Sequence, residues 1–216
     1  MSDSPSISGN HFEVVLFDVG GVLLTNGWDH VQRAAVLDCF ELDRAAFEAR
    51  HPEPYDALER DTITMEEYLQ ATIFYEPRSF TPEEFIEVMK VQSKPIPSNA
   101  LAVLDEISAS DRLLIGLLNN ESRLLHEYRM DKYGIENYLD IQLSSCYLGL
   151  RKPDPKIFQR ALQITQAAPG ESVFIDDRET NVGVAKDAGM HGVRFTTPEL
   201  LIKDLEALGI RELSKS

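Results

Sequence analysis

The stretch Val14-Val15-Leu16-Phe17-Asp18-Val19-Gly20-Gly21-Val22-Leu23 decides the fold class of this chain. Its first four residues are all apolar, which is typical of a strand buried on both faces of a parallel sheet. A carboxylate follows directly, and ligands bind at the carboxyl ends of strands in open parallel sheets. Asp18 is therefore a candidate catalytic residue, and the two glycines allow backbone N–H groups to approach a bound anion.

Further short apolar runs alternate with helical patterns along the rest of the chain. Together with the first run at Phe12–Phe17, they lie at Leu113–Leu118, Ile141–Leu143, Val173–Ile175 and Gly192–Phe195. Strands that alternate with helices predict an α/β fold with a doubly wound parallel sheet and helices on both of its faces.

The gap between the first and second strands is about 70 residues long, which is too long for one crossover helix. It contains helical patterns at Val31–Phe40, Met65–Phe74 and Pro82–Val91, and it ends in the stiff segment Lys94-Pro95-Ile96-Pro97. We therefore expect residues 11–25 and 97–216 to form an α/β core, and residues 26–96 to form an inserted helical cap.

Polar side chains also follow three later strands or turns. Asn119 and Asn120 end the second strand before a helix N-terminus, which favours anions. Lys152 precedes a rigid proline turn, where its ammonium group can neutralise a phosphate. Asp176 and Asp177 end a buried strand; such close like charges need a cation, and their hard oxygen ligands suit magnesium. Helix capping and a solvated lysine are the ordinary alternatives for each motif alone.

The composition limits the partners of the chain. The formal net charge of −15 argues against binding to nucleic acid and to anionic membranes. No apolar run reaches the roughly 18 residues that a membrane span needs. The start of the chain, residues 1–10, lacks the features of a secretory signal and is expected to be a frayed tail. Cys39 and Cys146 are far apart, which indicates reduced thiols and a cytoplasmic protein.

Taken together, the four motifs resemble those of the haloacid dehalogenase superfamily. They occur in the same order: the strand-end Asp18, the polar strand end at Asn119, the segment Arg151-Lys152-Pro153-Asp154-Pro155, and Asp-Asp-x-x-x-Asn from Asp176 to Asn181. The helical insert is similar to that of the small-cap group, which includes bacterial sugar-phosphate phosphatases such as glucose-1-phosphate phosphatases. The resemblance implies a Rossmann-like core and a magnesium-dependent hydrolase of a small phosphorylated metabolite, such as a sugar phosphate. The sequence leaves both a monomer and a homodimer open.

The resemblance also implies a role for each matching residue. Asp18 would attack phosphorus and form an aspartyl-phosphate, while Lys152 steadies Asp18 and the phosphoryl charge. The groups expected to hold Mg²⁺ are the carboxylates of Asp18, Asp176 and Asp177 and the backbone carbonyl of Gly20. Asn181 would orient these ligands. The residues expected to bind substrate are Asn119, Asn120, Gly20 and Gly21.

Two departures from the family pattern keep other functions open. Most family phosphatases carry a second aspartate, as general acid and base, where this chain has Gly20, and they carry Ser or Thr where it has Asn119. These departures leave a catalytically weak or inactive phosphate-binding regulatory protein as an alternative. A metal-free 2-haloacid dehalogenase also lacks the second aspartate, but it does not explain the pair Asp176 and Asp177.

The cap is expected to choose the substrate. Trp28, His30, Arg33 and Tyr55 are candidates to line the mouth of the site, with core packing as the alternative for Trp28 and a surface charge as the alternative for Arg33. A phosphonate-cleaving relative would need a lysine in the cap, and none occurs between residues 26 and 89.

Overall fold

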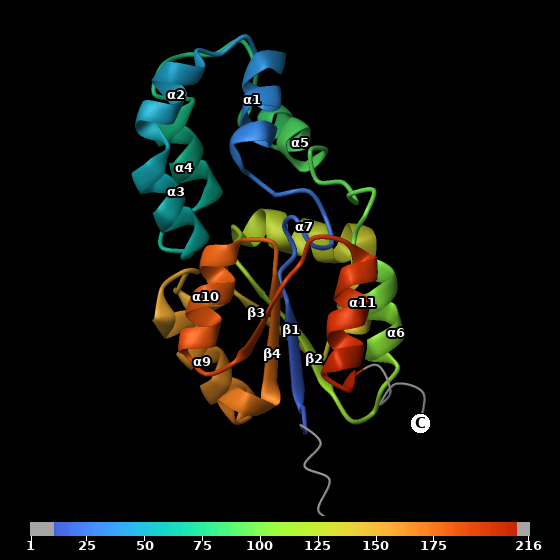
Figure 1. Cartoon of the computed structure of the whole chain (residues 1–216). Coiled ribbons are helices and arrows are strands. Elements are labelled where there is room, and N and C mark those ends of the chain that lie inside the picture. Colours follow the sequence, from blue (N-terminus) through green and yellow to red (C-terminus); the bar gives the residue numbers. More distant parts are fainter. Residues whose placement is uncertain (1–10, 211–216) are drawn as a thin grey trace, which may run out of the picture.

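The apolar run around Val14 forms the central strand of a parallel sheet in the computed structural model, which describes residues 11–210. The strands in chain order are β1 (Val14–Phe17), β2 (Leu114–Asn119), β3 (Ile141–Ser144), β4 (Ser172–Asp176) and β5 (His191–Arg194). They lie in the order β3-β2-β1-β4-β5, and all neighbouring strands are parallel (Figure 1). This arrangement confirms the predicted doubly wound α/β sheet.

The order of the strands places a crevice above β1. In the sheet, Phe17 pairs with Leu117 of β2 on one side and with Ile175 of β4 on the other. The chain continues from β1 toward β2 and β3, whereas β4 and β5 lie on the opposite side. Ligands of open α/β sheets bind where the strand order reverses in this way, at the carboxyl ends of the strands.

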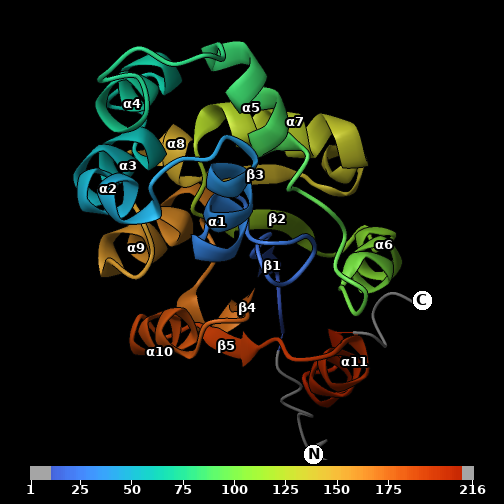
Figure 2. The same ribbon diagram turned by 90° about the horizontal axis from the view of Figure 1, so that it is seen from above.

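Helices cover both faces of the sheet. Val15 and Phe17 pack into a core that includes α6 (Leu101–Ser108) and α11 (Pro198–Ala207). Val14 and Leu16 point to the other side, because side chains alternate along a strand, and pack with α9 (Pro155–Thr165) and α10 (Glu179–Asp187). Figure 2 shows these two helix pairs on either side of the sheet. The remaining core elements are α7 (Arg123–Tyr133), α8 (Ser145–Leu148) and the 3-10 turns η1 (Ile135–Tyr138) and η2 (Pro169–Glu171).

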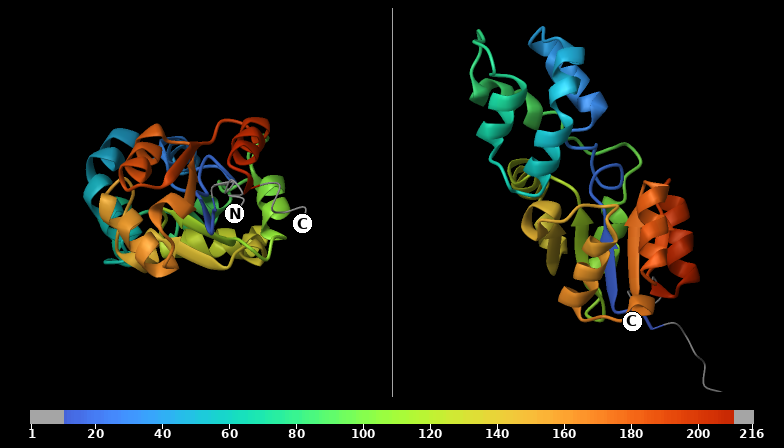
Figure 3. Two further views of the ribbon diagram at one scale, coloured as in Figure 1. Left: turned by 60° about the horizontal axis from the view of Figure 1, so that its bottom comes forward. Right: turned by 90° about the vertical axis from the view of Figure 1, so that its left-hand side faces the viewer.

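Five helices lie over the carboxyl ends of the strands, all between residues 26 and 96 (Figures 1 and 3). They are α1 (His30–Cys39), α2 (Arg44–Arg50), α3 (Pro52–Glu59), α4 (Met65–Thr72) and α5 (Pro82–Lys90). The predicted capping boxes at Thr64 and Thr81 start α4 and α5. We refer to residues 26–96 as the cap, the range proposed from the sequence.

The cap has its own hydrophobic core and is tied to the sheet layer below it. Trp28, Tyr68 and Phe85 are fully buried in this core, which Leu125 of α7 completes from below. The two chain segments that join the cap to the core run side by side, since Leu24 bridges to Pro95. Within residues 11–210, no helix combines the length and the apolar character that crossing a membrane requires.

Candidate active site

Asp18 lies at the carboxyl end of β1 and is held by two donors. Its Oδ1 accepts a hydrogen bond from the backbone N–H of Val19 at 2.8 Å and lies 2.9 Å from Nζ of Lys152. Asp18 and Lys152 are both buried. Because both donors engage Oδ1, the other carboxylate oxygen, Oδ2, is available to a substrate or a cation.

Asp176 ends β4 and is the most firmly fixed of the acidic side chains. Its Oδ2 accepts from Lys152 Nζ at 2.7 Å, and its Oδ1 accepts from the backbone N–H of Arg178 at 2.8 Å. The side-chain amide of Asn181 donates to both oxygens, at 3.1 and 2.9 Å. Asn181 therefore orients Asp176, and Lys152 bridges the ends of β1 and β4.

Asp177 completes a cluster whose chemistry fits a magnesium ion. Asp18, Asp176 and Asp177 each offer a carboxylate oxygen, and these three oxygens lie within 4.8 Å of one another. Oδ1 of Asp177 is buried and has no hydrogen-bond partner among the residues that the structure describes. Leaving a buried carboxylate oxygen without a donor costs free energy. Carboxylate oxygens are also the ligands that Mg²⁺ prefers. The residues present thus fit the predicted ion.

The pKa shifts of the clustered side chains agree with a cation site at Asp18, Asp176 and Asp177. Burial, and then the neighbouring Asp176, raise the pKa of Asp18 to about 7 against the opposing effect of Lys152. Burial and Asp176 also raise the pKa of Asp177. Burial disfavours the charge on Lys152, but Asp18 and Asp176 outweigh it and raise the pKa of the lysine. Lys152 therefore remains a cation, while the carboxylates lack enough positive charge to balance them.

The two glycines after Asp18 lie in crowded surroundings, and Gly21 also has a backbone conformation that favours glycine. Gly21 has φ of +76°, and a Cβ atom there would lie 2.2 Å from Oδ2 of Asp177. A Cβ atom on Gly20 would lie 2.7 Å from Oδ1 of Asn26. Gly21 thus lets the chain turn closely past the acidic cluster, and Gly20 lies against Asn26 of the cap.

The predicted asparagines have different surroundings. Asn120 accepts from the backbone N–H of Lys152 and donates to its carbonyl, both at 2.8 Å, so it positions the lysine. Asn119 is buried, and its amide nitrogen lies 3.5 Å from Nδ1 of His126. Asn120 lines the cavity described below, whereas Asn119 is not among its lining residues. Substrate binding by either asparagine remains a prediction.

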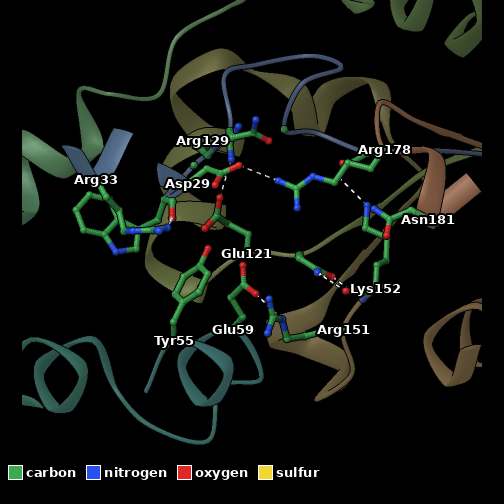
Figure 4. A pocket seen from close by; sticks show the side chains of 16 residues that line it. Asp29, Arg33, Tyr55, Glu59, Glu121, Arg129, Arg151, Lys152, Arg178 and Asn181 are labelled. Carbon is green, nitrogen blue, oxygen red and sulfur yellow. Dashed lines mark hydrogen bonds and ion pairs between the residues drawn. The ribbon is translucent and has the colours of Figure 1, made fainter. Parts of the chain in front are cut away.

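A cavity of about 100 Å³ lies above this cluster, between the core and the cap (Figure 4). The core contributes Asp18, Gly20, Asn120, Glu121, Arg129, Arg151, Lys152, Arg178 and Asn181, and the cap contributes Asn26, Gly27, Trp28, Asp29, Arg33, Tyr55 and Glu59.

The candidates for the mouth of the site divide into two groups. Trp28, Arg33 and Tyr55 line the cavity, whereas His30 is exposed at the start of α1 and does not. Trp28 also serves as core packing, since its Nε1 donates to the hydroxyl of Tyr68 at 2.7 Å. Arg33 is buried rather than a surface charge, and it is paired with Glu48 at 2.8 Å.

Several lining residues have no counterpart in the sequence-based expectations. Glu121 and Arg129 form a buried ion pair of 2.6 Å, and Glu59 lies 2.5 Å from Nε of Arg151. Arg178 reaches from the end of β4 to Asp29 of the cap at 2.8 Å. Glu121 and Arg129 are 8 residues apart, whereas the other two pairs join residues that are far apart in the chain and that no local pattern indicates.

Comparison with known proteins identifies the relatives of this chain. The model of the haloacid dehalogenase-like hydrolase family matches residues 12–189. The chain is 32% identical to flavin mononucleotide hydrolase 1 of Arabidopsis thaliana over 83% of its own length and 76% of that protein. It is 28% identical to acyl-CoA dehydrogenase family member 10 of Mus musculus over 93% of its length, but it spans only 19% of that protein.

A solved structure shares the fold. An HAD family enzyme from Bacteroides thetaiotaomicron superposes with a TM-score of 0.75 at 19% identity, covering 87% of this chain and 95% of that one. A second structure of that enzyme, with a TM-score of 0.69 at 19% identity, contains magnesium and inorganic phosphate and covers 86% of this chain and 95% of that one. At this level of identity the comparison supports the fold.

Proposed function

The chain belongs to the haloacid dehalogenase-like hydrolases, and we propose that it is a magnesium-dependent phosphomonoester hydrolase acting on a small phosphorylated metabolite. The observation that carries the proposal is the geometry around Asp18: a buried carboxylate, 2.9 Å from Lys152, grouped with two further carboxylates within 4.8 Å. A nucleophile, a fixed cation and an oxygen-rich cation site at one point are the components that phosphoryl transfer needs.

The proposed reaction has two steps on Asp18. In the first, Oδ2 attacks phosphorus, the bond between phosphorus and the leaving oxygen breaks, and an aspartyl-phosphate forms. In the second, the oxygen of a water molecule attacks phosphorus, the bond to Oδ2 breaks, and inorganic phosphate leaves. With Gly20 at the position of the usual second aspartate, the departing alcohol takes its proton from solvent.

The residues around Asp18 have separate tasks in this scheme. Lys152 holds Oδ1 and leaves Oδ2 free, and its charge stabilises the phosphoryl oxygens. Asn120 holds the backbone of Lys152, and Asn181 holds Asp176. Asp18, Asp176, Asp177 and the carbonyl of Gly20 would hold Mg²⁺, which when bound supplies positive charge to the transferring phosphoryl group.

The acidic cluster favours a phosphatase over a 2-haloacid dehalogenase. A haloacid carries its own carboxylate, which would face the carboxylates of Asp176 and Asp177 while Lys152 is already shared between Asp18 and Asp176. The name of the plant relative makes flavin mononucleotide one compound to test, alongside sugar phosphates. The cavity of about 100 Å³ is small, since pockets for drug-sized ligands measure about 300–1,000 Å³. This difference favours a small leaving group.

The proposal is tested by phosphate release from a panel of esters, with and without Mg²⁺. The panel contains p-nitrophenyl phosphate, glucose 1-phosphate, glycerol 3-phosphate and flavin mononucleotide. We expect turnover that requires Mg²⁺. Asp18→Asn should lower kcat at least about 1,000-fold, because an amide cannot act as the nucleophile, while the fold stays intact by circular dichroism.

Two results would contradict the proposal. An Asp18→Asn variant with more than about a tenth of the wild-type rate would exclude Asp18 as the nucleophile. A chain that folds and binds Mg²⁺ but hydrolyses no ester of the panel would instead support the phosphate-binding regulatory alternative. The cytoplasmic location and the choice between monomer and homodimer remain predictions from the sequence.

A further inference from the structure

The cavity extends from Lys152 to a wall rich in buried oxygen atoms. Tyr55 and Glu59 come from α3 of the cap, and Glu121 comes from the segment between β2 and α7. Figure 4 shows the Tyr55 hydroxyl and the two carboxylates gathered on one side of the cavity, with Arg178 and Asn181 on the other. The relative exposure of Glu59 is 3% and that of Glu121 is 2%, so both carboxylates are withdrawn from bulk water.

Every arginine that lines the cavity already has a carboxylate partner. The pairs are Arg33 with Glu48 at 2.8 Å, Arg129 with Glu121 at 2.6 Å, Arg151 with Asp56 at 2.6 Å and Arg178 with Asp29 at 2.8 Å. Lys152 is shared between Asp18 and Asp176. The lining therefore offers no spare cation to a second anionic group on a ligand.

The carboxylates keep capacity to accept hydrogen bonds, and among the described residues Nε of Arg129 and Nε of Arg151 are also buried without a hydrogen-bond partner. Each carboxylate oxygen can accept more than one bond. Oε2 of Glu59 lies 2.5 Å from Nε of Arg151, but no N–H or O–H of the described residues points at it in hydrogen-bond geometry. Leaving such a buried acceptor unmet is costly. Burial, despite Arg151, also raises the pKa of Glu59 to about 7, so a donor from a ligand would stabilise its charged form.

We propose that Tyr55, Glu59 and Glu121 form the leaving-group subsite, and that this subsite selects small, uncharged alcohols whose hydroxyl groups donate to the two carboxylates. The inference rests on the phosphatase function proposed above and narrows its substrate class. A ligand hydroxyl group would give Oε2 of Glu59 the donor that it lacks in hydrogen-bond geometry. It would also add a donor to Glu121, whose two oxygens already accept from the backbone N–H of Ser122 and from Arg129. An alkyl group would offer Glu59 no donor, and a carboxylate group would be repelled by both carboxylates.

Three phosphate esters with three carbons each test the selection directly. They are glycerol 3-phosphate, propyl phosphate and 3-phosphoglycerate, assayed with Mg²⁺ at pH 8 so that Glu59 is ionised, with p-nitrophenyl phosphate as the reference for activity. We expect kcat/KM for glycerol 3-phosphate to exceed that for the other two esters at least about tenfold, since a hydrogen bond to a charged group is worth about 1.5–3 kcal/mol.

Variants separate recognition from the chemistry of the leaving group. Glu59→Gln should reduce the ratio of kcat/KM between glycerol 3-phosphate and propyl phosphate about tenfold, and Tyr55→Phe should reduce it less. The matched control is Glu66→Gln, an exposed glutamate of the cap, which should leave the ratio unchanged. Because both esters meet the same altered enzyme, their ratio cancels any general loss of catalytic rate.

The outcomes distinguish the proposed leaving-group subsite from the proposed phosphatase function. A wild-type enzyme that cleaves p-nitrophenyl phosphate but does not prefer glycerol 3-phosphate overturns this inference and leaves the proposed function standing. An unchanged ratio in a folded Glu59→Gln or Tyr55→Phe variant also overturns it. Absence of turnover with all four esters overturns the proposed function, and the inference falls with it.

Discussion

At the scale of single residues, the space beside Gly20 is occupied by Asn26. A Cβ atom on Gly20 would lie 2.7 Å from Oδ1 of Asn26 and 3.3 Å from its Cα atom. Gly20 is not among the residues with positive φ, so crowding rather than backbone conformation is what opposes a side chain there. An aspartate at position 20 therefore cannot simply be restored without moving Asn26.

We predict that the wild-type rate depends strongly on the acidity of the leaving group. A general acid contributes about 100- to 10,000-fold, and this chain lacks the usual one. Single-turnover rates for a series of aryl and alkyl phosphates should fall steeply as the pKa of the alcohol rises. The double variant Gly20→Asp with Asn26→Ala should flatten this dependence.

Gly20→Asp alone is the informative control. With Asn26 in place, the added side chain must displace the Asn26 amide before it can reach the leaving group, and we expect little gain for alkyl esters. Rates of the wild type that do not vary with leaving-group pKa would show that another residue already supplies the proton.

Glu59 provides a pH-dependent prediction of stability. Its pKa is raised from 4.5 to about 7 by burial, so between these values the native state holds a proton that the unfolded chain has released. The unfolding free energy should therefore fall as pH rises from about 5 to 7, by an amount on the order of 3 kcal/mol at most. Glu59→Gln should remove this part of the slope in urea unfolding.

The exposed Glu66→Gln variant should keep the wild-type slope. Parallel pH profiles for Glu59→Gln and the wild type would mean that Arg151 holds Glu59 ionised throughout, and that the pKa of Glu59 is not raised.

At the scale of elements, local patterns predicted the sheet and missed the cavity wall. The five strands lie within two residues of the apolar runs in the sequence. The runs are clearest for β1, β2 and β4, because these strands are buried on both faces. The proximity of Asp18 and Asp176 was also predictable, since parallel strands end at one edge, whereas the place of Lys152 beside them was implied by the family resemblance. Glu59 and Glu121 were not, because their role depends on where α3 packs on the core, which no periodicity encodes.

The cap is attached unevenly to the core. Near the carboxyl end of α3, Arg151 contacts Asp56 and Glu59, and Arg123 of α7 contacts Asp61 at 2.6 Å. Across the cavity, Arg178 contacts Asp29 through an exposed pair at the start of α1. The α1 side of the cap therefore has the weaker ionic attachment to the core. We expect the cavity between the cap and the core to open on this side.

We predict that Asp29→Asn loosens the α1 side of the cap. Asparagine remains a good N-cap for α1, so the substitution removes mainly the charge that Arg178 contacts. An exposed ion pair is worth about 0–1 kcal/mol, so hydrogen exchange of amides in α1 should accelerate by up to about fivefold, while exchange in α3 stays constant.

The matched control is Glu87→Gln, which removes an ion pair with Lys90 within α5, outside both α1 and α3. It should not change exchange differently in α1 and α3. If Asp29→Asn accelerates exchange equally in α1 and α3, or in neither helix, the ion pair between Arg178 and Asp29 does not hold the α1 side of the cap against the core.

At the scale of the whole molecule, an acidic chain concentrates several of its carboxylates at one point. The net charge is −15, and the fold brings Asp18, Asp176 and Asp177 together where β1 and β4 end. Lys152 alone contacts two of these carboxylates, which leaves the cluster short of positive charge. Stability is therefore linked to the binding of a cation at the site.

We predict that Mg²⁺ raises the melting temperature of the intact chain. A ligand that binds only the native state adds about 2.7 kcal/mol at 100 times its Kd, which corresponds to roughly 5–10 °C for a chain of this size. Asp177→Asn should raise the melting temperature without Mg²⁺, because it removes a crowded carboxylate, and should abolish most of the increase on adding the ion. Asp187→Asn, an exposed change at the end of α10, should behave as the wild type. A shift matched by KCl at equal ionic strength, or one that Asp177→Asn retains, would place the effect of Mg²⁺ on the general surface charge and not on this cluster.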